Sequence, residues 1–306
     1  MSPTPTIRGT WGTVLLPLDS DERIDWTALA DGIDALIDAG VSGIYSNGTA
    51  GEFFNQTEDE FDRLSQILAE RCSKAGMPFQ LGVSHVSPWQ SRERLSRVVA
   101  LKPSAFQVIL PDWSPPTLEE STWFLSGMAE VAGDTPLVLY NPPHAKVRLD
   151  PAQFGALRRA VPSIAGVKVP VGDDDWFKAM REHCPGLSVF VSGHTLASSI
   201  QKGAHGSYSN VACLNPRAAQ DWYEQMSTDL PGALDLEGRI QAFLNAQIRP
   251  FITDQGYSNQ AVDKFMACVG GWSPITTRLR WPYRSIPESQ VEPARRAGRA
   301  LIPEFF

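Results

Sequence analysis

Short apolar stretches alternate with longer stretches in which apolar residues recur every three or four positions, from residue 12 to residue 226. The first pattern is typical of buried β-strands and the second of amphipathic helices. We predict eight strands, at residues 12–16, 41–46, 79–83, 106–110, 136–140, 164–169, 187–191 and 205–209. We predict a helix after each strand, at residues 26–40, 57–74, 89–100, 118–131, 150–160 and 174–183, from residue 195, and at 216–226.

Strict alternation of strands and helices predicts an α/β fold with a parallel sheet, because each crossover is long enough to carry a helix. Eight units favour a closed (β/α)8 barrel, or TIM barrel. A doubly wound open sheet is the alternative, but no G-x-G-x-x-G turn follows the first strand. Beyond Pro231 the pattern is only helical, so we expect a barrel at 1–229 and a C-terminal helical extension at 230–306 packed on it.

Composition narrows the class of protein. The 306 residues are 42% hydrophobic and 20% charged, with a formal net charge of −7, which is typical of a soluble globular protein. No cluster of Lys and Arg suits a nucleic acid, and no long apolar run suits a membrane or a signal peptide, so we expect neither partner and a cytoplasmic location. The four cysteines lack the spacing of a zinc site, so we expect no metal.

Lys168 lies near the end of the apolar stretch 164–169. In such barrels the C-terminal ends of the strands form the active site. A lysine there can simply extend its amine to solvent or to a carboxylate. Alternatively, apolar surroundings lower its pKa, and the free amine can then attack a carbonyl and form a Schiff base.

Two other strand ends carry polar groups that would meet Lys168 at the same mouth. Tyr140 ends the fifth strand and could move protons for a Schiff-base lysine, or it could be an aromatic residue of the rim. The turn at 47–52 follows the second strand, and its glycines let backbone N–H groups approach an anion closely. That turn could also serve only to reverse the chain.

These residues resemble the dihydrodipicolinate synthase/N-acetylneuraminate lyase family over nearly the whole chain. The resemblance rests on five motifs in the same order, which are G-T-x-G-E at Gly48 to Glu52, Y-N-x-P at Tyr140 to Pro143, G-x-K at Gly166 to Lys168, Ser192-Gly193, and Gly206-x-x-Ser209.

The resemblance implies a class I aldolase for a pyruvate-type 2-oxo acid and, as second substrate, an aldehyde. Lys168 would form the Schiff base, Tyr140 would shuttle the proton, and Thr49 with the amides of its loop, including Gly48 and Ala50, would hold the carboxylate or join the proton relay. It also implies that no metal or organic cofactor is needed and that the chain forms a homo-oligomer, a tetramer or a dimer.

Several positions depart from the family pattern and concern the second substrate. Ala50 replaces a hydroxyl residue, and Trp113 stands where the synthases place a tyrosine that reaches across a dimer interface. The sequence His144-Ala145-Lys146 lacks the arginine expected after Y-N-x-P, and Tyr208 is bulkier than usual. These changes argue against dihydrodipicolinate synthesis, whereas His144 and His194 offer a different polar surface for the substrate.

Three functions therefore fit the sequence. The first is a lyase that performs aldol cleavage or condensation on a 2-oxo acid. The second is a dehydratase for a 2-keto-3-deoxy sugar acid that uses the same lysine. The third, of another class, is a barrel that binds a 2-oxo acid without turning it over.

Overall fold

The computed structural model describes residues 6–170 and 172–306. Within these residues eight parallel strands pair in sequence order, and β1 closes the barrel by pairing with β8. The strands are β1 (Gly9–Thr13), β2 (Gly43–Ser46), β3 (Phe79–Gly82), β4 (Ala105–Ile109), β5 (Leu137–Tyr140), β6 (Ile164–Lys168), β7 (Ser188–Val191) and β8 (Gly206–Tyr208). The prediction of a (β/α)8 barrel is confirmed, and the open-sheet alternative is wrong.

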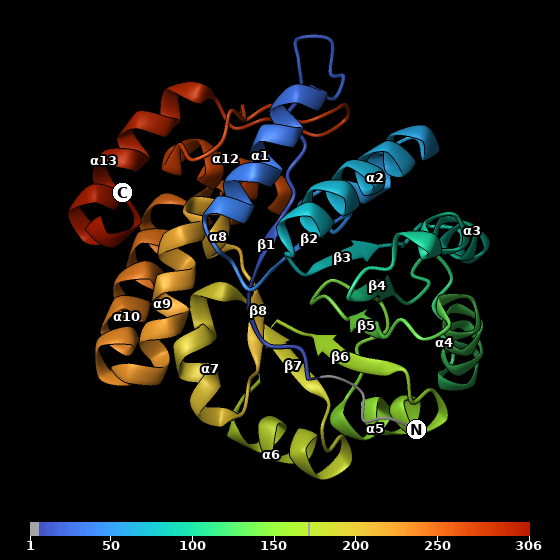
Figure 1. The fold of residues 1–306 in the computed structure, drawn as a ribbon. Coiled ribbons are helices and arrows are strands. Elements are labelled where there is room, and N and C mark those ends of the chain that lie inside the picture. The colour runs from blue at the N-terminus through green and yellow to red at the C-terminus, as the bar shows by residue number, and fades with distance from the viewer. Residues whose placement is uncertain (1–5, 171) are drawn as a thin grey trace.

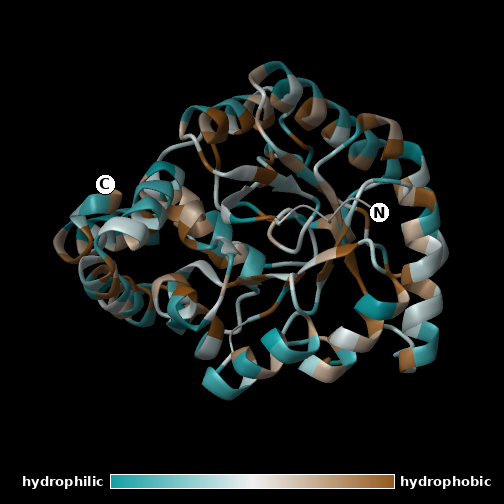
Figure 2. Cartoon of the chain, turned by 60° about the horizontal axis from the view of Figure 1, so that its bottom comes forward, coloured by the Kyte–Doolittle hydropathy of each residue, from teal (hydrophilic) through white to brown (hydrophobic). Residues whose placement is uncertain are grey.

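Helices surround the barrel, and the helices of the C-terminal part of the chain pack beside it (Figure 1). Those of the ring are α1 (Trp26–Asp38), α2 (Glu58–Ala75), α3 (Pro88–Val98), α4 (Leu118–Ala132), α5 (Pro151–Ala160), α6 (Asp174–His183), α7 (Leu196–Lys202), α8 (Val211–Leu214) and α9 (Pro216–Thr228). The C-terminal helices are α10 (Leu230–Gln247), α11 (Arg249–Thr253), α12 (Asn259–Gly270) and α13 (Val291–Leu301). Hydrophobic and hydrophilic stretches alternate along the ring helices, as amphipathic packing requires (Figure 2).

Helix α2 shows how local sequence sets an element's limits. Thr57 accepts a hydrogen bond from the backbone N–H of Glu60, and the Glu60 side chain accepts one from the N–H of Thr57. This capping box satisfies two N–H groups that the first helical turn leaves free. Gly76 ends the helix at a φ of 68°, a conformation that glycine adopts without steric cost.

The first strand lies three residues before its predicted position. We expected it at 12–16, whereas β1 is Gly9–Thr13. Leu15 is apolar for another reason, because it packs outside the sheet against Ala50 and against Ala267 of α12. The extra apolar residues therefore contact the C-terminal helices and not a neighbouring strand.

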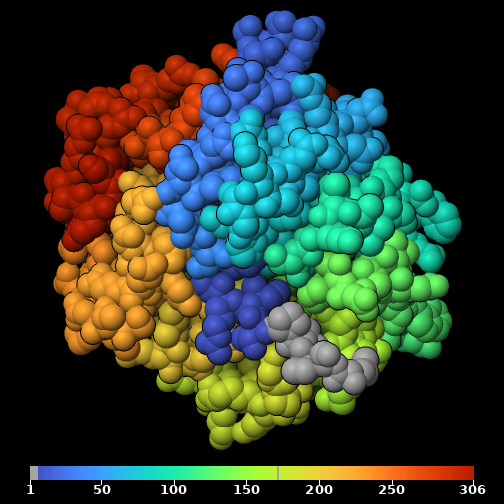
Figure 3. All heavy atoms as spheres, in the orientation of Figure 1, coloured from blue at the N-terminus to red at the C-terminus, as the bar shows by residue number. Residues whose placement is uncertain are grey.

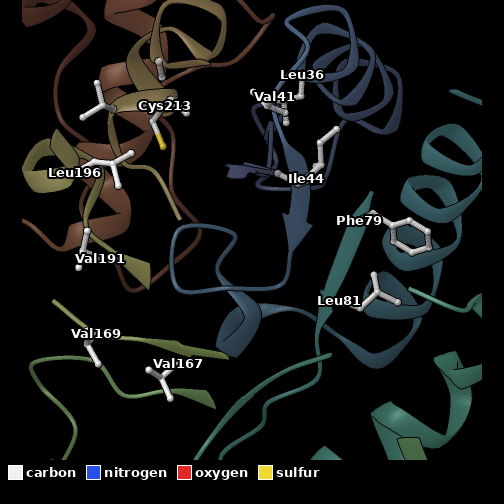
Figure 4. Close-up of a cluster of buried hydrophobic side chains, with 14 of the residues drawn as sticks. Leu36, Val41, Ile44, Phe79, Leu81, Val167, Val169, Val191, Leu196 and Cys213 are labelled. Atoms are coloured by element: carbon white, nitrogen blue, oxygen red, sulfur yellow. The ribbon is translucent and has the colours of Figure 1, made fainter. Parts of the chain in front are cut away.

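Two apolar layers fill the structure. The larger lies between the strands and the helices, where Ile44, Phe79 and Leu81 are fully or almost fully buried (Figure 4). The smaller fills the barrel itself and includes Trp11 and Phe190, whose side chains point inward. A barrel of this size is thus a packed core and not a pore.

The N-terminal mouth of the barrel is closed by the segment that precedes β1. Ile7 is buried in the inner layer, and its backbone N–H donates to Oγ of Ser188 at 3.0 Å. Figure 3 shows this dark blue segment at the centre of that face. The opposite mouth, where the strands end, is the one that holds a cavity. In the part of the chain that the structure describes, no helix has the length and apolarity to cross a lipid bilayer.

Candidate active site

A cavity of about 580 Å³ lies at the C-terminal ends of the strands. Its floor comes from the barrel and includes Tyr45, Tyr140 and Lys168. Its outer wall comes from the C-terminal helices, with Gln241 on α10 and Asp263 on α12 among the lining residues. The site is therefore built jointly by the barrel and the tail.

Lys168 is the last residue of β6, and its amine is enclosed by aromatic rings. Nζ lies 4.1 Å from the ring centroid of Tyr140, 5.1 Å from that of Tyr45 and 5.2 Å from that of Tyr208. The three rings come from β5, β2 and β8, so the closure of the barrel is what brings them together.

This enclosure changes the chemistry of the amine. Burial lowers the pKa of Lys168 to about 8, against the opposing effect of the Asp263 carboxyl. Loss of water around an ammonium disfavours its charged form, so a larger share of the group is free amine near neutral pH than for an exposed lysine. The amine is thus a usable nucleophile.

Tyr140 and Thr49 both line the cavity beside Lys168. Burial raises the pKa of Tyr140 to about 12, and a hydrogen bond with the Thr49 hydroxyl acts in the opposite direction. The phenol is therefore protonated at neutral pH and can donate a proton or pass one along. The structure brings together the three residues predicted to be catalytic.

The turn after β2 reaches the cavity through Thr49 and Ala50. Among the described residues, no acceptor is found for the backbone N–H groups of either residue. Gly48 is buried beneath the surface of the cavity, and a Cβ there would lie 3.0 Å from Cε2 of Tyr45. Its lack of a side chain leaves room for the Tyr45 ring, and its contact with substrate stays a prediction.

A buried ion pair fixes this turn to the tail. Lys264 of α12 places Nζ 2.6 Å from a carboxylate oxygen of Glu52, which has a φ of 52°, and both side chains are almost completely buried. The same Nζ donates to the carbonyl oxygen of Arg278 at 2.7 Å. The turn that carries Thr49 and the helix that carries Asp263 are therefore held together.

Helix α12 also approaches the barrel closely at its other end. A Cβ on Gly270 would overlap the carbonyl oxygen of Leu214 in α8. The indole N–H of Trp272 donates to the carbonyl oxygen of Cys213 at 2.7 Å. These contacts set the position of α12 over the strand ends.

Asp263 brings a carboxyl group to the cavity that the sequence analysis missed. It shares one face of α12 with Asn259, Val262 and Met266, which all line the cavity and follow helical spacing. Burial raises the pKa of Asp263 to about 7, and the charge of Lys168 acts against that rise. The signal in the sequence was the pair Asp263-Lys264, two charged residues inside the apolar run 261–269.

Two further lining residues were not predicted. Tyr45 lies just before the end of β2, and its phenol faces Thr13; burial raises its pKa. Cys213 belongs to the short helix α8, which was not expected, and burial raises the pKa of its thiol well above the usual value. Tyr45 was recognisable as an aromatic residue close to a strand end.

The predicted residues His194 and Tyr208 reach the cavity. His194 is partly buried, its Nδ1 lies 3.2 Å from Oδ1 of Asn210, and burial lowers its pKa. Tyr208 donates its hydroxyl to Oε1 of Gln80 at 2.6 Å, so its phenol is held in the barrel and its ring faces Lys168.

The other two predicted substrate-binding residues, Trp113 and His144, lie outside this chain's cavity. Trp113 is 82% exposed, and Nζ of Lys146 lies 5.4 Å from its ring centroid. His144 is exposed on the loop after β5. Lys146 links the two loops by donating to the carbonyl oxygen of Trp113, and Pro143, the residue before His144, does line the cavity.

Metal chemistry was not expected from the cysteine spacing. Within 6–170 and 172–306, no three His, Cys, Asp or Glu side chains gather in an arrangement able to hold a metal ion.

Sequence comparisons place the chain among known proteins. A model of the dihydrodipicolinate synthetase family matches residues 6–295. The 4-hydroxy-tetrahydrodipicolinate synthase of Acidovorax sp. (strain JS42) is 27% identical over 312 residues, covering 98% of this chain and 99% of that protein. The N-acetylneuraminate lyase of Escherichia fergusonii is 27% identical over 203 residues, covering 65% of this chain and 67% of the lyase.

Solved structures share the fold. CdNal from Clostridium difficile, in complex with mannosamine, superposes with a TM-score of 0.84 at 19% identity, covering 97% of this chain and 100% of that one. YagE, a prophage protein from E. coli K12 in complex with pyruvate, gives a TM-score of 0.84 at 18% identity, covering 97% and 99%.

The barrel, the site at its C-terminal mouth and these relatives define the class, which is a lyase of the class I aldolase type. The chain belongs to the dihydrodipicolinate synthetase family.

Proposed function

We propose that the protein acts on a pyruvate-type 2-oxo acid by forming a Schiff base between Lys168 and the ketone carbon, and that it cleaves or forms an aldol bond. The observation that carries this proposal is the amine of Lys168, enclosed by three tyrosine rings and with its pKa lowered to about 8 by burial. Once formed, the imine withdraws electrons from the neighbouring carbon, so a carbon–carbon bond one atom further along can break. YagE, which shares the fold, was solved in complex with pyruvate, and this supports the choice of ligand.

The surrounding residues supply the other steps. Tyr140 would move the proton that the carbinolamine loses and gains as water leaves. Thr49 would orient that phenol, since the two hydroxyls interact. The free N–H groups of Thr49 and Ala50 would hold the carboxylate of the 2-oxo acid.

The second substrate would meet a wall unlike the synthase pattern. Ala50 supplies no hydroxyl, and the arginine of the synthases has no counterpart in His144-Ala145-Lys146. The wall is instead formed by side chains of the tail and of the loop after β7, including Gln241, Asn245 and His194. Polar side chains of this kind suit the hydroxyl groups of a sugar-derived aldehyde.

A 2-keto-3-deoxy sugar acid dehydratase is the second candidate. The observation that favours it is the Asp263 carboxyl, whose pKa of about 7 lets it deliver a proton to a departing hydroxyl group. Product analysis separates the two reactions, because cleavage releases an aldehyde and dehydration does not. The presence of both Lys168 and Tyr140 in one cavity argues against the third function, a barrel that only binds the acid.

The first experiment is reductive trapping. The protein is incubated with pyruvate, reduced with cyanoborohydride, and analysed by intact mass and peptide mapping. We expect one adduct, on Lys168, with a rate of formation that rises from pH 7 to pH 9 as the amine of pKa about 8 loses its proton.

Two variants serve as comparison. Lys168→Ala should form no adduct and should unfold at nearly the wild-type temperature, because no hydrogen bond or ion pair to Nζ is found among the described residues. Lys178→Ala, an exposed lysine of α6, should trap pyruvate like the wild type. An adduct on another lysine, or none with any 2-oxo acid, would contradict the proposal.

We further propose that the protein works in the cytoplasm as a homo-oligomer, a tetramer or a dimer. The support for assembly is a group of exposed tryptophans, Trp89, Trp113 and Trp123, on and beside the adjacent helices α3 and α4. Large exposed apolar residues that gather on one face commonly mark a protein interface.

A further inference from the structure

The cavity contains a carboxyl group able to exchange a proton with substrate, and the proposed roles of Lys168, Tyr140 and Thr49 do not use it. Among the described residues that line the cavity, Asp263 is the only one with a carboxyl group. Within the same residues its carboxylate has no hydrogen bond and no ion pair. Asp263 is only partly buried, and its carboxyl lines the cavity without a protein partner, so it is available to a bound substrate.

The position of Asp263 suits a substrate held on Lys168. Its charge acts on groups from four elements, which are Lys168 of β6, Tyr140 of β5, Tyr45 of β2 and Cys213 of α8. Asp263 and Lys168 line the same cavity, the carboxyl on the wall formed by the tail and the amine on the floor formed by the barrel. A 2-oxo acid bound to Lys168 would extend its distal carbons toward that wall.

We propose that Asp263 is the acid–base group for the hydroxyl on the fourth carbon of a 4-hydroxy-2-oxo acid bound to Lys168 as an imine, an inference that rests on the proposed function. In the cleavage direction the carboxylate takes the hydroxyl proton, and the oxygen's electrons form the new carbonyl. The bond between the third and fourth carbons breaks, and its electron pair passes through the second carbon to the iminium nitrogen. The products are an aldehyde and an enamine on Lys168, with no change of overall oxidation state.

The protonation equilibrium of the site supports this role. The iminium on Lys168 carries a positive charge, which favours the carboxylate form of Asp263 and so prepares the base. Three other titratable groups of the cavity are less suited, because burial raises the pKa values of the Tyr45 and Tyr208 phenols and of the Cys213 thiol. With a pKa of about 7, Asp263 can both take and return a proton near neutral pH.

The test separates this role from formation of the Schiff base. Asp263→Asn keeps the size of the side chain and loses the base, and it is expected to fold because no protein partner is removed. Asp254→Asn, an exposed aspartate that ends α11, is the matched control. Each variant is trapped with pyruvate and then assayed for pyruvate release from 4-hydroxy-2-oxopentanoate, 4-hydroxy-2-oxoglutarate and 2-keto-3-deoxygluconate.

We expect Asp263→Asn to form the Lys168 adduct at a rate within about an order of magnitude of the wild type and to lose pyruvate release by a factor on the order of 10² or more. Asp254→Asn should match the wild type in both assays. Asp263→Glu should recover part of the lost turnover, because it restores a carboxyl group.

Other results would overturn the assignment in distinguishable ways. Absence of the adduct in the wild type would remove the Schiff-base proposal itself. If the wild type and Asp263→Asn both form the adduct and release pyruvate at equal rates, only the proposed role of Asp263 is wrong. Loss of the adduct in Asp263→Asn would show that this carboxyl acts on Lys168 and not on the substrate hydroxyl. Formation of the wild-type adduct without pyruvate release from any of the three acids would count against a role in cleaving such hydroxy acids.

Discussion

Lys168 owes its chemistry to its surroundings more than to its residue type. An exposed lysine is almost entirely protonated at neutral pH, whereas three tyrosine rings and the surrounding protein remove water from this one. Asp263 partly compensates, because its charge favours the ammonium form. The balance leaves a pKa of about 8, where both the protonated and the nucleophilic forms are populated under ordinary conditions.

The proposed proton transfer by Tyr140 can be tested with a single substitution. Tyr140→Phe removes the phenolic proton and keeps the ring that encloses Lys168, so the adduct with pyruvate should still form. Turnover should fall by a factor on the order of 10² to 10⁴, the usual range for a lost acid–base group. Tyr283→Phe, an exposed tyrosine of the tail, provides the comparison in the same kinetic assay. Turnover equal to that of the wild type would mean that another group moves this proton.

The turn after β2 and helix α12 show how elements share a site. The turn supplies Thr49 to the cavity, and the helix supplies Asp263. The ion pair between Glu52 and Lys264 joins them, with 2.6 Å between Oε1 and Nζ and with both side chains buried. Such a pair adds little net stability, but it strongly penalises any arrangement in which one charge is left alone.

Breaking that pair should therefore be costly. Glu52→Gln leaves the buried ammonium of Lys264 without its carboxylate, and we expect the free energy of unfolding to fall by about 3–5 kcal/mol. Lys264→Met should cost a similar amount, and the double variant less than the sum, as measured by denaturant titration. Glu304→Gln, which opens the exposed pair with Arg239, should change stability by less than about 1 kcal/mol. Equally small losses of unfolding free energy in all variants would show that the buried pair does not hold the turn after β2 against helix α12.

At the scale of the whole molecule, the barrel and the tail share one apolar core. A single cluster of buried residues runs from Val14 beside the barrel to Phe305 in the tail. Arg280 of the tail also forms an ion pair with Glu60 of α2 at 2.9 Å. The tail thus shares its core with the barrel, and the division of the chain at residue 229 stays a prediction.

Assembly is the property to measure at this scale. We expect a native mass of two or four times 33.6 kDa in solution, because Trp89, Trp113 and Trp123 expose large apolar side chains on and beside the adjacent helices α3 and α4. Replacing Trp89 and Trp113 by arginine should lower that mass. Trp281→Arg, a change at a tryptophan of the tail that is 77% exposed, is the control, and light scattering after size-exclusion chromatography is the measurement. A monomeric wild type would contradict the expectation.

Different parts of the structure were predictable to different degrees. The strands and helices could be predicted from local periodicity, since the spacing of apolar residues over a few positions shows which face of an element is buried. Lys168, Tyr140 and Thr49 were found because each lies at or just beyond a strand end. Asp263 was missed because its helix comes about a hundred residues after Lys168, and only packing reveals which face of it lines the cavity. Trp113 and His144 were placed at the site by motif position alone, and in this chain both side chains are exposed and outside the cavity.

The sequence by itself determined the alternation of strands and helices, which favours a closed barrel, and the position of Lys168 at a strand end, because apolar periodicity and strand-end position are local properties. The tertiary structure decided what surrounds that lysine. Closure of the barrel brings Tyr45, Tyr140 and Tyr208 around one amine, and the tail brings Asp263 to face it. Desolvation and charge interaction depend on distances between residues far apart in the chain, so the pKa values of about 8 for Lys168 and about 7 for Asp263 exist only in the folded protein.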